Sequence, residues 1–220
     1  MARIRLAPEL RRAQLLDLGA ELFAAEPYER VHIERVADIA GVSRGLLYHY
    51  FPTKAAFFAA LIERSSGRLM AASVPDPALS PLEQLRHGID AYLAHCRANS
   101  HAARAVHRGA ASADPDVVAI IERGNRAQEE RILGALAANP HPLVVIAVRA
   151  WLRFLRTAWL EWIDRPEVPL DELREVCVAA LVGALSGLPE NAKPASLDSI
   201  VEASPIRDET VNVKWMKDFR

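Results

Sequence analysis

Residues 32–63 constrain the fold more than any other stretch, because they carry two helix breaks at a short spacing. The stretch reads HIERVADIAGVSRGLLYHYFPTKAAFFAALIE. Gly41 allows the positive-φ turn after a first helix, and Ser43 is placed to cap the next helix through its side-chain oxygen. Pro52 ends this second helix, and Thr53 is placed to cap a third. This order predicts a helix-turn-helix unit whose second helix spans residues 44–51.

The motif AGVSRGLLYHYFPTK within this stretch resembles the signature of the TetR-type (tetracycline-repressor-like) transcriptional regulators. The matching residues are Val36, Ala37, Ala40, Gly41, Val42, Ser43, Gly45, Leu47, Tyr48, Phe51 and Lys54. Upstream, LLDLGAELF at 15–23 resembles the first-helix pattern of the family, so the similarity covers roughly residues 10–63. The rest of the chain resembles the family in length and helical layout alone. The resemblance implies an all-α fold with a helix-turn-helix DNA-binding domain followed by a helical ligand-binding and dimerisation domain.

Composition limits where DNA can bind and where the protein works. The 220 residues are 51% hydrophobic, so a sizeable core is expected, and the net charge of −1 excludes a generally basic surface. Any DNA contact must therefore come from a local surface. Cys96 and Cys177 are isolated thiols, which fits a reducing cytoplasm. The chain starts without a secretory apolar region, and three arginines interrupt its longest apolar helix, so no membrane partner is expected.

Apolar periodicity predicts further helices and no strands. We expect helices at 8–26, 54–72, 81–99, 115–138, 143–164 and 170–188. The predicted domains are 1–53 for DNA binding, with the linking helix 54–72, and 73–188 for ligand binding and dimerisation. Residues 189–220, rich in Pro, Ser, Ala and charge at their start, are expected to be a flexible tail. Because the last ten residues contain Val, Trp, Met and Phe, a tail folded back onto the body or onto the partner subunit is the alternative.

The helix at 44–51 has one face that fits a core and one that fits a major groove. Leu47 and Phe51, spaced i and i+4, should face inward. Arg44 is then the best base reader, because its guanidinium can bind a guanine edge with two hydrogen bonds. Gly45 permits close backbone approach to the DNA. Leu46, where family members often carry a small or hydroxyl residue, either touches a thymine methyl or packs.

The resemblance adds further DNA-contacting candidates. It implies that Tyr48 binds a phosphate and that His49 and Tyr50 also contact DNA. Thr53 and Lys54 form a phosphate clamp at a helix N-terminus. The full set of candidates is His32, Ser43, Arg44, Gly45, Tyr48, His49, Tyr50, Thr53 and Lys54. His32 is a departure, since family members often have Ser or Thr there, capping the helix and touching phosphate. The alternative for the whole stretch is a helical interaction module without DNA affinity.

The helix at 143–163 is apolar around most of its circumference, with Arg149, Arg153 and Arg156 on one narrow side. A helix of this kind must be covered on two or more sides. The helix at 170–188 offers small and apolar residues for close contact, namely Leu173, Val176, Ala180, Ala184 and Gly187. As the family resemblance implies, two copies of this helix pair should form a four-helix dimer interface, which a two-fold operator also requires. The alternative is a monomeric core that uses both faces internally.

A ligand pocket is predicted from one polar residue in an apolar stripe. Gln128 lies among apolar positions with Asn125 beside it, and a buried amide needs a partner. That partner is a bound small molecule, an ordinary side chain or water. The candidate pocket residues are Tyr92, His95, Cys96, Asn125, Gln128, Trp151 and Phe154, which favour a small effector that is hydrophobic or aromatic.

No metal or cofactor is expected, because His95, His101 and His107 lack the i, i+4 spacing of helical metal ligands. No phosphate loop or nucleophile motif supports an enzyme either. The sequence therefore predicts a homodimeric repressor that a ligand releases from a palindromic operator. The rivals are a small-molecule-binding helical protein with a silent DNA-binding domain, and an enzyme built in the helical pocket. DNA affinity separates the repressor from both rivals.

Overall fold

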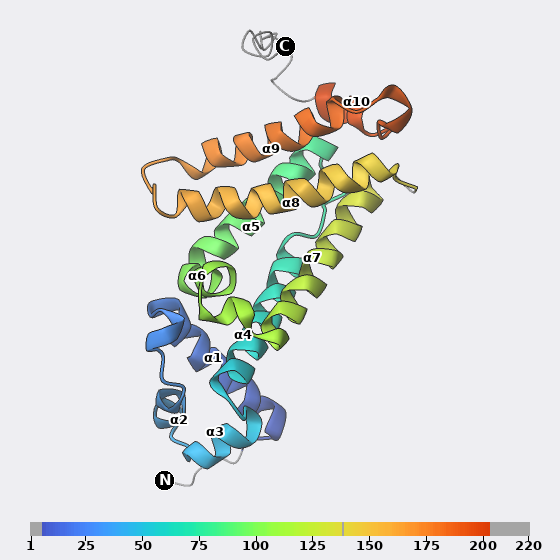
Figure 1. The fold of residues 1–220 in the computed structure, drawn as a ribbon. Coiled ribbons are helices and arrows are strands. Elements are labelled where there is room, and N and C mark those ends of the chain that lie inside the picture. Colours follow the sequence, from blue (N-terminus) through green and yellow to red (C-terminus); the bar gives the residue numbers. More distant parts are fainter. Residues whose placement is uncertain (1–5, 138, 203–220) are drawn as a thin grey trace.

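The computed structural model describes residues 6–137 and 139–202, and all regular secondary structure in these ranges is helical (Figure 1). The α-helices are α1 (Pro8–Ala25), α2 (Glu34–Ala40), α3 (Arg44–Tyr50), α4 (Lys54–Ala72), α5 (Pro81–Ala98), α6 (Ser100–Arg108), α7 (Pro115–Leu136), α8 (Pro142–Trp162), α9 (Leu170–Ser186) and α10 (Leu197–Glu202). Short 3-10 helices are η1 (Tyr28–Arg30), η2 (Ala110–Ala113) and η3 (Glu190–Ala192). The predicted all-α fold is confirmed.

The helices form an elongated molecule with two ends (Figure 1). Helices α1, α2 and α3 lie at one end, while α8 and α9 run side by side at the other. Helix α4 leaves the first end directly after α3 and packs along α7, which reaches towards α8. Helix α4 therefore contacts α1 at one end and α5 and α7 in the body. No helix in the described ranges is long and apolar enough to cross a membrane.

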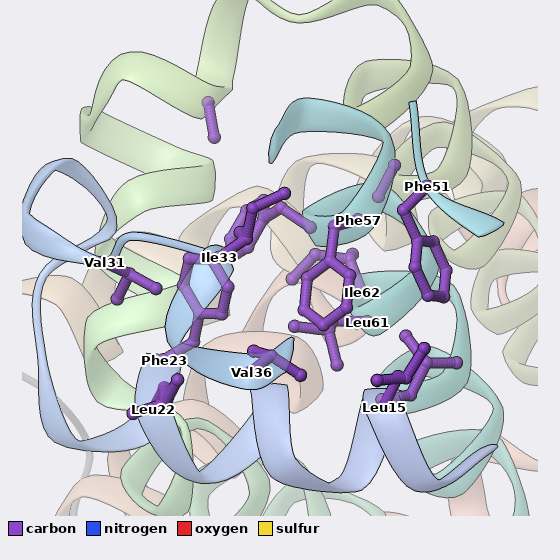
Figure 2. Close-up of a cluster of buried hydrophobic side chains, with 14 of the residues drawn as sticks. Leu15, Leu22, Phe23, Val31, Ile33, Val36, Phe51, Phe57, Leu61 and Ile62 are labelled. Carbon is purple, nitrogen blue, oxygen red and sulfur yellow. The ribbon is translucent and has the colours of Figure 1, made fainter. Parts of the chain in front are cut away.

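The buried side chains around α1 to α4 form a first core (Figure 2). Its aromatic centre joins Phe23 to Phe58, with ring centroids 5.0 Å apart, and Phe51 to Phe57, 4.7 Å apart. Side chains from beyond α4 also belong to this core, namely Ala105, Val106, Ala111, Val117 and Ile120 of α6, η2 and α7. The core beneath the helix-turn-helix unit thus extends into the body of the protein.

A second core fills the space between α5, α7, α8 and α9. Trp159 is fully buried in it, and Trp151 donates its indole N–H to the Cys177 carbonyl oxygen at 2.7 Å, which ties α8 to α9. The predicted stripe of α5 is buried at Leu82, Ile89 and Leu93. Helix α8 is therefore held from more than one side, as its composition requires.

The expected flexible tail needs correction over its first part. Residues after α9 form η3 and α10, and Leu197 and Ile200 of α10 are buried in the second core. The Ser196 hydroxyl donates to the Leu136 carbonyl oxygen at 3.0 Å, which fixes α10 against the end of α7. The first part of this segment, as far as α10, thus packs on the body of the protein. The apolar residues near the C-terminus, from Val211 onwards, lie outside the described residues.

Candidate DNA-binding surface and ligand cavity

The turn before α3 has the geometry that its sequence demands. Gly41 has φ 64°, a left-handed conformation that favours glycine. The Ser43 hydroxyl oxygen accepts a hydrogen bond from the Leu46 N–H at 3.2 Å, which caps α3. Leu47 is fully buried and Phe51 is 2% exposed, so these two side chains attach α3 to the first core. The orientation of α3 is thereby set by buried contacts.

The opposite face of α3 is open to solvent. Arg44, Gly45, Tyr48 and His49 are exposed, as the sequence pattern predicted. The Arg44 guanidinium is 4.0 Å from the Asp38 carboxylate, an exposed pair that binds weakly in water. Leu46 and Tyr50 are half-buried, and Tyr50 packs on the first core. Their contacts with DNA stay predictions.

Tyr48 has a partner that the sequence did not reveal. Its hydroxyl donates a hydrogen bond to the carboxylate of Glu34 in the first turn of α2. This bond lowers the pKa of Glu34 and raises the pKa of Tyr48. To donate its hydroxyl proton to a DNA phosphate, Tyr48 must first break its hydrogen bond to Glu34. The sequence carried no signal for this pair, because the two residues lie on different helices.

The helix end at Thr53 matches the predicted cap, whereas Lys54 is already engaged. The Thr53 hydroxyl oxygen accepts from the Ala56 N–H at 3.0 Å. The Lys54 ammonium lies 4.4 Å from the centre of the Tyr28 ring and 3.4 Å from the Glu29 carbonyl oxygen. Partial burial lowers the pKa of Lys54. Its ammonium must share or release these contacts to hold a phosphate.

The N-terminus of α2 lacks a side-chain cap, and His32 is exposed beside it. In the predicted family pattern a hydroxyl residue at this position would supply that cap. The cap residue of α2 is Ile33, whose side chain has no acceptor, so the first N–H groups of α2 receive no side-chain hydrogen bond from the cap position.

A cavity of about 490 Å³ lies between α4, α5, α7, α8 and α10. Its volume falls within the ~300–1,000 Å³ range of small-molecule sites. Six of the seven predicted pocket residues line it, namely Tyr92, His95, Cys96, Asn125, Gln128 and Trp151. Most of the remaining wall is apolar and includes Leu69, Leu85, Ile132 and Leu155. The interior is therefore suited to an apolar molecule with a few polar contacts.

Phe154 is the exception among the predicted pocket residues. Its side chain is 40% exposed and is not part of the cavity wall. The reason is geometric: Trp151 and Leu155 of α8 face the cavity, and Phe154 follows the other apolar face of the same helix. That outer face also carries the exposed Ile146.

The polar groups of the cavity bond mainly to one another. Gln128 donates to the Ser73 hydroxyl at 3.4 Å, so the partner of this amide is an ordinary side chain. The Ser65 hydroxyl and the His95 imidazole lie 3.1 Å apart. Two arginines that were not predicted as pocket residues, Arg131 and Arg156, also line the wall.

Burial favours the neutral forms of the histidine, cysteine and tyrosine side chains of the cavity near pH 7. It lowers the pKa of His95, and burial with the nearby Arg156 charge lowers the pKa of His107 to about 4. It raises the pKa of the Cys96 thiol to about 12 and that of Tyr92 well above its ordinary value. Neither cysteine is therefore a thiolate nucleophile, since burial also raises the pKa of Cys177 to about 11.

An exposed second helix of a helix-turn-helix unit and an internal cavity, joined by one long helix, define the class of ligand-responsive helical DNA-binding regulators. The family model described as "Bacterial regulatory proteins, tetR family" matches residues 15–61, and "Tetracyclin repressor-like, C-terminal domain" matches residues 81–184. The chain belongs to the TetR family of bacterial regulatory proteins. It is a DNA-binding transcriptional regulator and not an enzyme, as the sequence predicted.

Full-length relatives and a solved structure agree with this assignment. The chain is 25% identical over 193 residues to the HTH-type transcriptional activator FasR of Mycolicibacterium smegmatis, covering 84% of this chain and 87% of FasR. It is 25% identical over 190 residues to the HTH-type transcriptional repressor KstR of Rhodococcus jostii, covering 84% and 88%. A TetR-family regulator from Streptomyces coelicolor shares the fold with a TM-score of 0.82 at 24% identity, covering 97% of this chain and 96% of that one.

Proposed function

We propose that the protein is a homodimeric repressor in the cytoplasm, the compartment that holds its DNA, and that a mainly apolar ligand in the cavity releases it from a palindromic operator. The observation that carries this proposal is the two-sided character of α3, with Leu47 buried and Arg44 exposed. Arg44 binds a guanine edge, and Tyr48 and Lys54 bind phosphates once they leave their present partners. The other predicted DNA contacts complete the surface around them.

The dimer is supported by an apolar face that no part of the described chain covers. On α8 the exposed residues include Leu143, Ile146 and Phe154; on α9 they include Val176, Ala179, Gly183, Ala184 and Gly187. Ile146 is 61% and Val176 is 55% exposed. A contiguous exposed apolar surface marks an interaction site, and small residues on α9 let another helix approach closely. Two copies meeting here form a four-helix interface and present two α3 helices to the DNA.

The coupling between ligand and DNA is supported by side chains that serve both regions. Ile62 of α4 and Val106 of α6 belong to the first core and also line the cavity. A ligand that displaces these two side chains also shifts the part of the first core against which α3 packs. Helix α4 is also tied to α1 through an ion pair between Arg64 and Asp17. The ligand favours a conformation in which the two α3 helices no longer match successive major grooves.

Fluorescence anisotropy with DNA from immediately upstream of the gene tests the DNA-binding role. The wild-type protein is expected to bind this duplex more tightly than a scrambled duplex at the same salt concentration. Arg44→Ala should cost about 1–3 kcal/mol on the selected sequence and little on the scrambled one. Lys54→Ala should weaken binding to both duplexes alike.

Arg126→Ala is the matched control, because Arg126 is exposed on α7, away from α3. It should leave both affinities unchanged. An equal loss on both duplexes for Arg44→Ala would show that Arg44 contacts no base. If wild type does not distinguish the two duplexes, selection from random DNA decides between a distant operator and a protein without sequence preference.

A further inference from the structure

The cavity carries positive charge without an acidic residue to balance it. Arg131 and Arg156 line the wall, and no Asp or Glu is found among the described residues that line it. The whole chain, in contrast, has 27 Lys and Arg residues against 28 Asp and Glu residues. The histidines of the wall are neutral near pH 7, because burial lowers the pKa of both His95 and His107. The cavity interior is therefore cationic.

Arg131 has its partners within the protein. Its guanidinium donates to the Ser73 carbonyl oxygen at 2.8 Å, to the Ser73 hydroxyl at 2.9 Å and to the Met70 carbonyl oxygen at 3.1 Å. These acceptors lie at the C-terminal end of α4, where the helix dipole favours a cation. Arg131 thus stabilises the end of α4 and needs no further acceptor.

Arg156 is less well satisfied. Its guanidinium is partly buried, and its hydrogen bond within the described chain goes to the neutral Asn125 side-chain oxygen at 2.8 Å. No carboxylate of the described residues lies within ion-pair distance of it, whereas Arg149 on the same helix pairs with Glu129 at 2.8 Å. A guanidinium has five N–H donors, and a buried cation without a counter-charge is costly.

The cavity extends from this guanidinium along apolar walls. Its lining on α7 runs from Ile121 to Leu136, about 22 Å of helix axis, and Asn125 lies near the first of these residues. Leu69 of α4, Leu85 of α5 and Ile132 of α7 supply the wall on the way. Arg131 also lies along this length, but its guanidinium is bonded to the end of α4. The Arg156 guanidinium, beside Asn125, is therefore the charge left for a ligand, and the apolar walls suit an unbranched or ring-containing apolar tail.

We infer that the effector is an amphipathic organic anion whose head binds the Arg156 guanidinium and whose tail fills the apolar part of the cavity. This inference rests on the proposed function, because it names the class of ligand that the regulator senses. A planar carboxylate and a tetrahedral phosphate ester each offer two oxygens that an arginine guanidinium can bind with two hydrogen bonds. Asn125 is a positioning residue, since its oxygen holds the guanidinium in place.

Binding of three probes with the same tail to the full-length protein tests the charge of the head. Dodecanoate, dodecyl phosphate and dodecanol are titrated below their micelle-forming concentrations, with Trp fluorescence and calorimetry as readouts. Trp151 lines the cavity and reports occupancy. At least one anion is expected to bind about tenfold or more tightly than the alcohol, as a hydrogen-bonded charge pair implies. The anion that binds with higher affinity shows whether the natural effector is a carboxylic acid or a phosphorylated compound.

Two substitutions test whether Arg156 is responsible. Arg156→Gln removes the charge and should reduce the preference for the anion to less than about twofold. Asn125→Asp is almost isosteric and places a carboxylate next to Arg156, so it should abolish the same preference while keeping the folded structure. Arg153→Gln is the control, because Arg153 is exposed on α8 and donates only to the Arg149 carbonyl oxygen among the described contacts. Circular dichroism and the melting temperature check the fold of each variant.

The inference would be overturned if the wild type bound the anions and the alcohol with equal affinity. It would also be overturned if neither anion bound. A preference that survives in both Arg156→Gln and Asn125→Asp would also overturn it. Operator release, measured in parallel, separates this inference from the proposed function. If dodecanol releases the operator as well as the anions do, the regulator mechanism stands and the anion site is wrong. If an anion binds through Arg156 without changing operator affinity, the site stands and the effector role fails.

Discussion

Gly19 of α1 packs closely against the edge of the Phe57 ring in the first core. A Cβ atom at this position would lie 2.3 Å from two carbons of the Phe57 ring, far inside contact distance. The ring is itself enclosed, so the clash cannot be relieved by moving it into solvent. We expect Gly19→Ala to lower the free energy of unfolding by about 1–3 kcal/mol, as overpacking of a core does. Urea denaturation followed by circular dichroism measures this.

Gly67 gives the matched control for this prediction. It lies on the exposed side of α4, and a Cβ there would meet nothing within 4 Å. Gly67→Ala is expected to raise the free energy of unfolding by about 0.4–1 kcal/mol, because alanine favours the helix and restricts the unfolded chain. Equal effects of the two substitutions would contradict the close packing at Gly19.

His107 predicts a dependence of stability on pH. Burial lowers its pKa from the ordinary 6.5 to about 4, so the unfolded chain binds a proton at a higher pH than the folded chain does. Between these two values the unfolded state holds more protons, and stability rises with pH. The free energy of unfolding should therefore fall as the pH is lowered from about 6.5 towards about 4, by at most about 1.4 kcal/mol per pH unit from this group.

His107→Gln removes the titrating ring and should flatten the decline over that pH range. The comparison is made by denaturation of both proteins at a series of pH values. Arg156 faces His107, and the half-buried His95 lies in the same cavity with a lowered pKa, so His95→Gln provides a second reference. A His107→Gln protein with the wild-type pH dependence would show that another group causes it.

Single-residue predictions from the sequence succeeded where one face of a helix decides the outcome. Leu47 and Phe51 are buried and Arg44 is exposed, because an i, i+4 pair defines the inner side of a short helix. Phe154 failed because α8 has two apolar faces, and periodicity does not say which one meets the cavity. Periodicity likewise placed Arg156 with Arg149 and Arg153 on one charged side of the helix and did not indicate that Arg156 lines the cavity. The role of Lys54 beside Tyr28 depends on a contact between elements, which no local pattern encodes.

At the scale of whole elements, the position of α10 lets us predict how removing it changes stability and ligand binding. Ser196 and Ile200 line the cavity, and Leu197 is buried in the second core. A chain that ends at Leu188 loses this wall and exposes apolar surface of the second core. We expect a lower melting temperature and weaker binding of the dodecyl probe that wild type binds best, measured by thermal denaturation and Trp fluorescence.

A chain that ends at Glu202 keeps η3 and α10 and serves as the control. Retention of the melting temperature and of probe affinity in the Leu188 variant would mean that α10 contributes nothing to the cavity. The two truncations together separate the described helix from the residues that follow it.

The long helices and the helix-turn-helix pair were predictable, whereas α6 and α10 were not. Helices α4, α5, α7, α8 and α9 begin and end within about two residues of their predicted bounds, because proline or a hydroxyl cap stands at most of their starts. Helix α6 follows α5 after Asn99 alone, so no break in the sequence separates the two. Helix α10 has six residues, too few for a periodic pattern, and it is stabilised by burial against α5 and α9.

At the scale of the whole molecule, the exposed apolar face of α8 and α9 predicts the oligomeric state. Val176→Arg places a charge in the middle of this face, where a partner copy would bury it without a counter-ion. The variant is expected to sediment as a monomer at concentrations at which the wild type is a dimer. Its affinity for a two-fold operator should fall strongly, because each monomer then binds a half-site alone.

Val118→Arg is a matched control, since Val118 is an exposed apolar residue of α7 outside this face. It should leave sedimentation and operator affinity unchanged. If Val176→Arg remains a dimer, another surface joins the two copies.

The extension of the first core into the body has a consequence for building hybrid biosensors. Joining residues 1–72 to the body of another regulator replaces Ala105, Val106, Ala111, Val117 and Ile120, which complete the packing beneath the helix-turn-helix unit. The transplanted segment would then rest on side chains of the wrong volume, and mismatched packing lowers stability. A crossover that carries these five body positions along with residues 1–72 preserves the native contacts. The useful boundary for such a graft is therefore a set of touching side chains and not a single cut in the chain.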